Sequence, residues 1–259
     1  MNALRHGVRA LLLGAGALAP LCALAADDEI MVTDADLAAV GRLELEVHSN
    51  FSQGTNVSPG EGEFAPNHVL RITPELSYGL TRHWDVGLYL PVSLVPGRTF
   101  YYDGIKLRTK LSDAQPIADA ARVYYGVQLE AADVNPGISR DRTSVEVKAI
   151  AGTQIGAYDF AINAIEQHDV PDRDLISPGY AFNLKLVRDL GHEVAVGVEN
   201  YVSWSSTNTE APVREIDKLS FLTVQWKARD WDLHLGLGHG WSNSPDRTIV
   251  KLVIGVPLQ

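Results

Sequence analysis

Residues 70–94, which read LRITPELSYGLTRHWDVGLYLPVSL, decide the fold. Apolar residues take alternate positions from Leu70 to Leu80, and the alternation resumes at Trp84. Period-two alternation predicts strands, and two such runs separated by the short polar stretch Thr81–His83 predict a hairpin. Each run is about 11 residues long, above the usual five or six of a soluble sheet and close to what a tilted strand needs to cross a bilayer. The stretch therefore predicts a membrane hairpin.

Residues 1–25 have the pattern of a secretory signal peptide. A positively charged start precedes the apolar run Ala10–Leu21, and Ala23–Ala25 provides a small-x-small cleavage site. We expect cleavage near the end of this segment. The remaining chain is then a short, loosely ordered periplasmic lead over residues 26–39 and a single barrel domain over residues 40–259.

Composition excludes several classes of protein. The chain has 259 residues and one cysteine, Cys22, which lies within the signal segment, so a disulfide scaffold and a thiolate metal site are excluded. The formal net charge of −10 at pH 7 argues against nucleic acid as a partner, because nucleic-acid-binding proteins carry basic patches. No later apolar run reaches the roughly 18 residues of a membrane helix. An exported chain of this kind is a soluble all-β protein or an outer-membrane barrel.

Alternating segments recur along the whole chain. We expect about twelve strands, the even number that is typical of bacterial single-chain barrels. Besides the first hairpin, they lie at residues 42–51, 104–111, 121–131, 144–155, 158–167, 179–188, 193–204, 218–227, 231–241 and 248–258.

Short and long connections alternate between these strands, as expected for periplasmic turns and outer loops. The tight turns lie at 81–83, 156–157, 189–192 and 228–230, and the long loops at 52–66, 132–143, 168–178, 205–217 and 242–247. Two connections fit less well. Residues 96–103 are short for an outer loop, and residues 112–120 are long for a periplasmic turn.

Aromatic residues on the apolar parity gather at the two ends of the strands. Rings with a polar edge are most stable at headgroup depth, so two groups of this kind predict the two aromatic girdles of a membrane barrel. Trp84, Tyr158, Trp226 and Trp231 lie beside tight turns, and Phe51, Tyr180, Trp204 and Trp241 lie at the opposite strand ends.

Charged residues mostly fall on the polar parity of the strands. The exceptions, Glu166, Arg188 and Lys218, lie at strand ends. A basic side chain that faces lipid at mid-depth costs about 2–4 kcal/mol, and this cost falls toward the interfaces. The polar parity is therefore expected to face the lumen.

Two groups of charges are expected to line that lumen. The basic wall comes from two neighbouring strands and comprises Lys106, Arg108, Lys110 and Arg122. The acidic wall and the periplasmic mouth comprise Asp85, Asp159, Glu193, Glu199 and Asp232, of which all but Glu199 directly follow a tight turn.

These charges allow two interpretations. Opposed walls would orient a small polar or ionic solute, since rings of charge are a common selectivity device. Alternatively, the acids and bases pair across a narrow interior and largely plug it. Twelve strands lie between eight, where side chains fill the interior, and sixteen, where an aqueous channel remains.

The stretch Pro74–Pro91, PELSYGLTRHWDVGLYLP, resembles the outer-membrane barrel family of phenol-degradation meta-pathway transporters. Members carry a strand ending in a Gly-Leu-Thr-like turn, then Trp, an acid, Val-Gly and an apolar run to Pro. The close match covers about eighteen residues. The resemblance implies an outer-membrane channel or transporter and no catalytic residues. The chain departs from most barrels because it ends in Val256–Gln259 and lacks the terminal aromatic residue read by the barrel-assembly machinery.

No motif indicates catalysis, a cofactor or a metal. The eight histidines form no HExxH, and neither GxSxG nor GxxxxGK[ST] occurs. His48, His234, Ser77 and Ser93 are residue types found in catalytic dyads, but their spacing favours none. We therefore expect a protein that is not an enzyme, binds no metal and needs no cofactor.

The sequence thus predicts an all-β, transmembrane, antiparallel up-and-down β-barrel in the cell outer membrane of a Gram-negative bacterium. The leading function is a narrow, porin-like channel for small polar or ionic solutes, aromatic ones among them. One alternative is a structural or partner-binding barrel with a plugged lumen, and another is a lumen-site lipid or lipopolysaccharide hydrolase. Expected partners are outer-membrane lipid, the barrel-assembly machinery and the solute, and not nucleic acid.

Overall fold

The computed structural model describes residues 29–54, 64, 67–97, 100–135, 137, 143–170, 178–205, 216–241 and 246–258. The expected signal peptide and most of the loop at residues 52–66 lie outside these ranges. Within these ranges, no helix has the length and apolar character needed to span a membrane.

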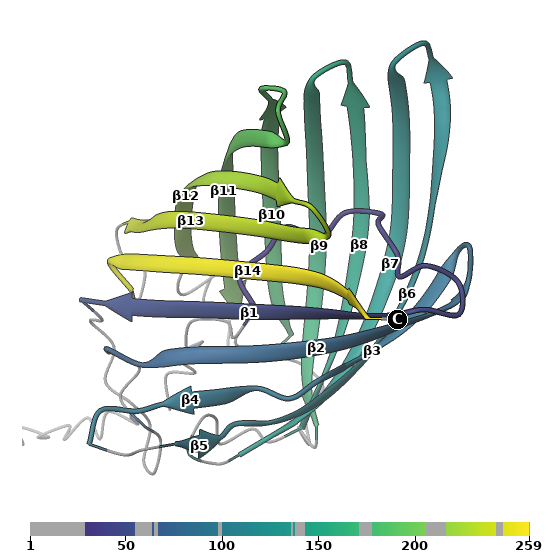
Figure 1. The fold of residues 1–259 in the computed structure, drawn as a ribbon. Coiled ribbons are helices and arrows are strands. Elements are labelled where there is room, and N and C mark those ends of the chain that lie inside the picture. Colours follow the sequence, from purple (N-terminus) through teal and green to yellow (C-terminus); the bar gives the residue numbers. More distant parts are fainter. Residues whose placement is uncertain are drawn as a thin grey trace, which may run out of the picture.

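Fourteen strands form one antiparallel sheet that closes on itself, because β1 pairs with both β2 and β14 (Figure 1). Twelve of them build the barrel, and the short β4 and β5 are extra. The strands are β1 (Leu43–Gln53), β2 (Leu70–Thr81), β3 (Trp84–Tyr89), β4 (Val92–Leu94), β5 (Tyr101–Tyr102), β6 (Gly104–Ala118), β7 (Ala121–Val134), β8 (Thr143–Ile155), β9 (Tyr158–Val170), β10 (Gly179–Asp189), β11 (Val194–Ser205), β12 (Ile216–Ala228), β13 (Trp231–Trp241) and β14 (Thr248–Leu258).

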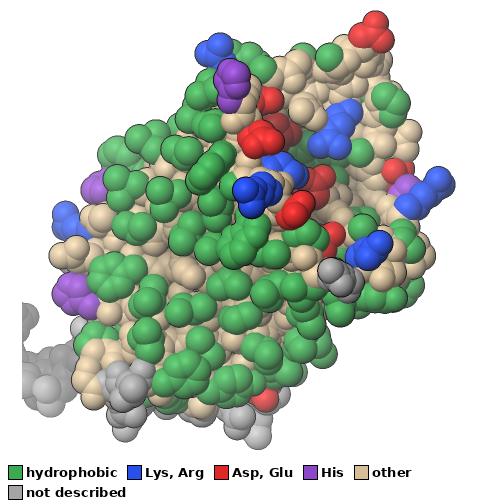
Figure 2. All heavy atoms as spheres, viewed as in Figure 1, with side chains coloured by type: hydrophobic (Ala, Val, Ile, Leu, Met, Phe, Trp, Pro, Cys, Tyr) green, Lys and Arg blue, Asp and Glu red, His purple; other side chains and the backbone are tan. Residues whose placement is uncertain are grey.

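The two faces of the sheet have opposite character, which confirms the predicted barrel. On β2, Leu76, Tyr78 and Leu80 point outward and are exposed, whereas the alternate residues Glu75 and Ser77 point inward and are buried. Figure 2 shows one face of this outer surface, on which hydrophobic side chains predominate over charged ones. An apolar outside around a polar inside is the arrangement of transmembrane barrels and the reverse of a soluble one.

The second strand of the first hairpin is interrupted. The predicted run from residue 84 to 94 divides into β3 and β4 at Leu90–Pro91. Pro91 has no N–H to donate to a ladder, which explains the break. The carbonyl of Pro91 accepts a hydrogen bond from Asp103 N (3.0 Å), and Leu90 N donates to Pro74 O (3.0 Å), so the broken strand stays joined to the sheet.

The connection between β6 and β7 corrects the expected long turn at residues 112–120. Strand β6 continues to Ala118, and Ala118 pairs with Ala121 across the two-residue turn Asp119–Ala120. Residues 114–118 are all exposed, so this part of the strand buries no apolar face. Without a buried face there is no alternation for a sequence pattern to reveal.

A charge placed on the outer face at the middle of a strand should destabilise the inserted barrel. Leu222 is 69% exposed and pairs with Val198 and Leu237 near the middle of β12. We expect Leu222→Lys to lower the free energy of unfolding in lipid vesicles by about 2–4 kcal/mol. Urea titration followed by tryptophan fluorescence measures the change, and Leu222→Ala controls for lost packing. Equal effects of Lys and Ala would contradict a lipid-facing surface at this position.

Candidate functional site: the barrel lumen

The lumen is the candidate site because the inward face of the strands carries the buried charges. These are spread over several strands and do not form one patch. In Figure 2, blue and red side chains gather where the apolar outer surface gives way to the interior. The buried charged side chains that face inward from the strands are Arg71, Glu75, Asp85, Arg108, Lys110, Lys185, Glu199 and Lys251.

Residues 29–41, here called the lumenal segment, run through this interior before the chain enters β1 (Figure 1, purple). The side chain of Asn163 on β9 makes two hydrogen bonds to the backbone of Thr33. Thr33 N donates to Asn163 Oδ1, and Asn163 Nδ2 donates to Thr33 O, each at 2.8 Å. Asn163 is fully buried, so this pair fixes the segment to the wall. The sequence-based expectation of a loosely ordered lead is thereby corrected.

Four further hydrogen bonds anchor the backbone of the lumenal segment to inward side chains of β3, β6 and β14. They span the length of the segment, so that its backbone polar groups find partners inside the barrel. The bonds run from Lys251 Nζ to Ile30 O (2.8 Å), from Ser112 Oγ to Ala35 O (2.6 Å), from Lys110 Nζ to Asp36 O (2.5 Å) and from Ala38 N to Asp85 Oδ2 (3.1 Å).

Apolar side chains of the lumenal segment also pack against the wall. Ile30 and Val32 are 5% and 2% exposed. Their neighbours form a small apolar cluster that interrupts the otherwise polar inner face: Tyr124, Ala161, Tyr201, Phe221 and Ile249. Tyr201 and Phe221 meet edge to face with ring centroids 5.6 Å apart.

Glycine makes room where the lumenal segment leaves the interior. Val40 forms an isolated parallel bridge with Gly79 on β2, and Gly41 N donates to Gly79 O (2.8 Å). A Cβ atom on Gly79 would lie 2.3 Å from Ala38 O. Any side chain at this position would therefore push the segment off the wall.

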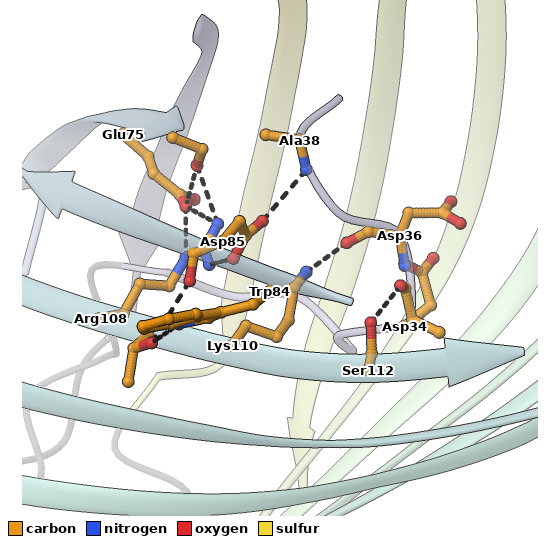
Figure 3. Close-up of polar contacts among 12 residues, drawn as sticks. Asp34, Asp36, Ala38, Glu75, Trp84, Asp85, Arg108, Lys110 and Ser112 are labelled. Carbon is orange, nitrogen blue, oxygen red and sulfur yellow. Dashed lines mark hydrogen bonds and ion pairs between the residues drawn. The ribbon is translucent and has the colours of Figure 1, made fainter. Parts of the chain in front are cut away.

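Arg108 on β6 lies at the centre of a buried charge cluster (Figure 3). Its Nε is 2.5 Å from Glu75 Oε1, and its Nη1 is 2.5 Å from Asp85 Oδ1. Its Nη2 donates to Ser77 Oγ (2.8 Å), and that hydroxyl donates to Glu75 Oε1 (2.7 Å). Asp85 also accepts the bond from Ala38, so this cluster joins three strands to the lumenal segment.

Two more clusters use lysine. Lys185 Nζ on β10 is 2.9 Å from Asp34 in the lumenal segment and 3.2 Å from Asp159 on β9. In the second cluster, Lys251 on β14 contacts Glu199 on β11, and both side chains are essentially fully buried. Glu199 also accepts a hydrogen bond from Tyr201.

The expected basic wall lies on neighbouring strands, but most of its charges have local partners. Lys106 Nζ is 3.4 Å from Glu130, while Arg108 and Lys110 bind the groups described above. Arg122 is exposed and donates to Gln154 Oε1 (2.9 Å).

The residues of the expected acidic wall are divided between these clusters and the turns at the strand ends. Asp85 lies against Arg108 within the basic wall, and Asp159 and Glu199 each meet a lysine. Glu193 lies in the turn before β11 with φ of 64°, and Asp232 is 3.5 Å from Lys227 with both side chains more than 60% exposed. The charges thus form local, compensated clusters, because inward side chains reach partners on strands one to three positions away, as Asp85 does with Arg108 and Glu199 with Lys251.

The eight residues of the expected aromatic girdles point outward near strand ends. Trp84 and Trp241 are 40% and 52% exposed, and Tyr180 stacks on Trp204 with centroids 5.9 Å apart. Trp84 Nε1 donates to Thr109 Oγ1 (2.6 Å), which satisfies its polar edge. Their depth in a membrane stays a prediction. The remaining members are Phe51, Tyr158, Trp226 and Trp231, all exposed.

Comparison with solved structures shows the fold of outer-membrane porins and channels. The COG4313 outer membrane channel from Pseudomonas putida F1 is 14% identical with a TM-score of 0.60, covering 89% of this chain and 100% of that chain. The KdgM porin is 8% identical with a TM-score of 0.53, and the NanC porin is 11% identical with a TM-score of 0.52. Each of these two comparisons covers 83% of this chain and 99% of the porin. No protein-family model and no curated protein sequence matches the chain.

Proposed function

We propose that this protein is an outer-membrane channel that passes small polar or ionic solutes. The observation that carries the proposal is a closed barrel with an apolar exterior and charged clusters along its inner wall. Charged side chains that line a pore act on the ions and dipoles that pass them. The porin and channel fold of the structural neighbours supports the same function.

The lumenal segment limits the size of the solute. A twelve-stranded barrel has a modest interior, and a peptide chain fixed to its wall reduces the free cross-section further. We therefore propose passage of ions and small molecules and not of long oligomers. A phenolic solute is proposed only on the resemblance of the stretch Pro74–Pro91 to the transporter family.

The same segment favours a second candidate, a structural barrel whose lumen is plugged. Its backbone is bonded to four strands, and Ile30 and Val32 are packed against the wall. A barrel closed in this way would carry no current. Conductance therefore separates the two candidates.

Planar-bilayer recording of the full, refolded chain tests the proposal. We expect discrete single-channel steps and an ion selectivity that shifts toward cations in Lys106→Gln, since this variant removes an inward positive charge. Lys227→Gln is the matched control, because Lys227 is a solvent-exposed rim lysine whose side chain is 63% exposed. Refolding is verified by heat-modifiable migration in SDS gels. Refolded protein that gives no steps would overturn the channel and support the plugged barrel.

A further inference from the structure

Three inward side chains at the junction of β1 and β2 converge on one point. Glu46 and His48 are two residues apart on β1, so both face the lumen. Glu75 lies on β2 directly opposite Glu46 in the register. One ligand atom from each of the three lies within 4.8 Å of the others. No other group of three such residues meets this criterion in the described ranges.

The geometry suits a small metal ion. His48 Nε2 is 2.8 Å from Glu46 Oε1 and 3.6 Å from Glu75 Oε2. Two ligand atoms of a tetrahedral Zn²⁺ ion lie about 3.3 Å apart, given bonds of about 2.0–2.1 Å. The two separations differ from that value by about 0.5 and 0.3 Å, so modest side-chain shifts would complete the coordination.

The burial and hydrogen bonding of His48 point to a ligand. The residue is 2% exposed, its Nδ1 makes no hydrogen bond to a described residue, and its Nε2 is directed at the two carboxylates, 2.8 Å from Glu46 Oε1, without hydrogen-bond geometry. A buried imidazole without such a bond is costly, because polar groups removed from water need partners. The two carboxylate oxygens of Glu75 have different partners. Oε1 accepts hydrogen bonds from Arg108 and Ser77, and Oε2 is directed at His48.

The excess of carboxylates around His48 also favours a divalent cation. Glu46 and Glu75 face each other across the strand pair, and like charges in that position repel. With Asp85 and Arg108 the cluster holds three carboxylates and one guanidinium, a net charge of −2 when His48 is neutral. Glu29, a further acid whose charge acts on His48, is 3.7 Å from Lys106. A proton on His48 would supply one compensating charge, and a metal ion supplies two.

We propose that Glu46, His48 and Glu75 bind a divalent transition-metal ion of the Zn²⁺ class on the lumen wall. One imidazole and two carboxylates are ligands that such ions accept, with a fourth position left for water. The side chain of Glu46 is 33% exposed, so the ion can enter from the lumen. The bound ion joins the first two strands of the barrel. The site is independent of whether the lumen conducts.

The test is calorimetric titration of the refolded, untagged chain with ZnCl₂ at pH 7.5 after removal of metals by a chelator. We expect one saturable site per barrel. Binding of Co²⁺, followed by its visible absorption, provides a second readout.

Two variants and a matched control localise the site. His48→Gln and Glu46→Gln should each weaken Zn²⁺ binding by at least about tenfold, the scale of losses seen when the shell of a metal site is altered. His168→Gln is the control, since His168 has a glutamate at the same spacing and the same 2.8 Å distance but no third ligand among described residues. Heat-modifiable migration confirms that each variant is folded. Wild-type protein without saturable binding, or folded variants that bind as wild type, would overturn the proposal.

Discussion

Deletion of residues 29–38 is expected to raise the single-channel conductance by at least about twofold, because the lumen of a twelve-stranded barrel is then no longer shared with a peptide chain. The barrel should still close, since β1 pairs along its length with β2 and β14 and none of these contacts involves the deleted residues. Single-channel recording of the refolded deletion variant in planar bilayers measures the increase.

A variant of equal length controls for the lost residues. Replacement of residues 29–38 by glycine and serine removes the contacts of Ile30 and Val32 and the charge of Asp34 while keeping the chain. We expect this variant to fluctuate between the conductance of the wild type and that of the deletion. A deletion variant that conducts as the wild type would show that the segment does not obstruct the pathway.

Lys251→Met is expected to lower the free energy of unfolding by about 3–5 kcal/mol, because removing one partner of a buried ion pair leaves the other charge uncompensated. Lys251 is 1% exposed, and Glu199, its partner, is 0% exposed. His234 at 3.2 Å and the hydroxyl of Tyr201 at 2.5 Å are the groups that remain beside Glu199. The substitution also removes the bond from Lys251 to the backbone of Ile30.

Two comparisons make this prediction specific. The double variant Lys251→Met/Glu199→Gln should recover part of the loss, since the orphaned charge is gone. Lys227→Met should change the stability by no more than about 0.5 kcal/mol, as is usual for an exposed pair. Urea titration in vesicles followed by tryptophan fluorescence gives the free energies. A loss in Lys251→Met as small as in Lys227→Met would contradict the importance of the buried pair.

The strands could be predicted from the sequence because each strand residue faces either an apolar exterior or a polar interior. Leu76 and Leu222 face outward, and Glu75 and Lys251 face inward, for the same reason: an apolar exterior and a polar interior alternate along each strand. The tight turns followed from the same alternation. The end of β6 was missed because it has no apolar face to bury.

The lumenal segment could not be predicted in the same way. Its partners are remote in sequence: Thr33 binds Asn163, and Ile30 binds Lys251. A pattern within the segment cannot reveal contacts that arise only when the barrel closes. The alternation of Ile30 and Val32 was the available signal, and it is too short to stand out.

The charge clusters were predicted in part. The sequence places Arg108, Asp85 and Glu75 on the inner face, but the strand register decides that they touch. The metal ligands Glu46 and His48 are visible as a local pair, whereas Glu75 joins them only across β1 and β2. A search for spacings within one strand therefore misses a site of this kind.

The meeting of β1 and β14 has a consequence for the order of assembly. The chain's first and last strands form the seam of the cylinder, and contacts between such distant residues form late, because their loop-closure entropy must be offset first. The stretch before β1 packs on Phe221 and Ile249, which lie toward the other terminus. We therefore expect residues 29–41 to lie against these strands before the seam joins, so that the closing cylinder encloses them.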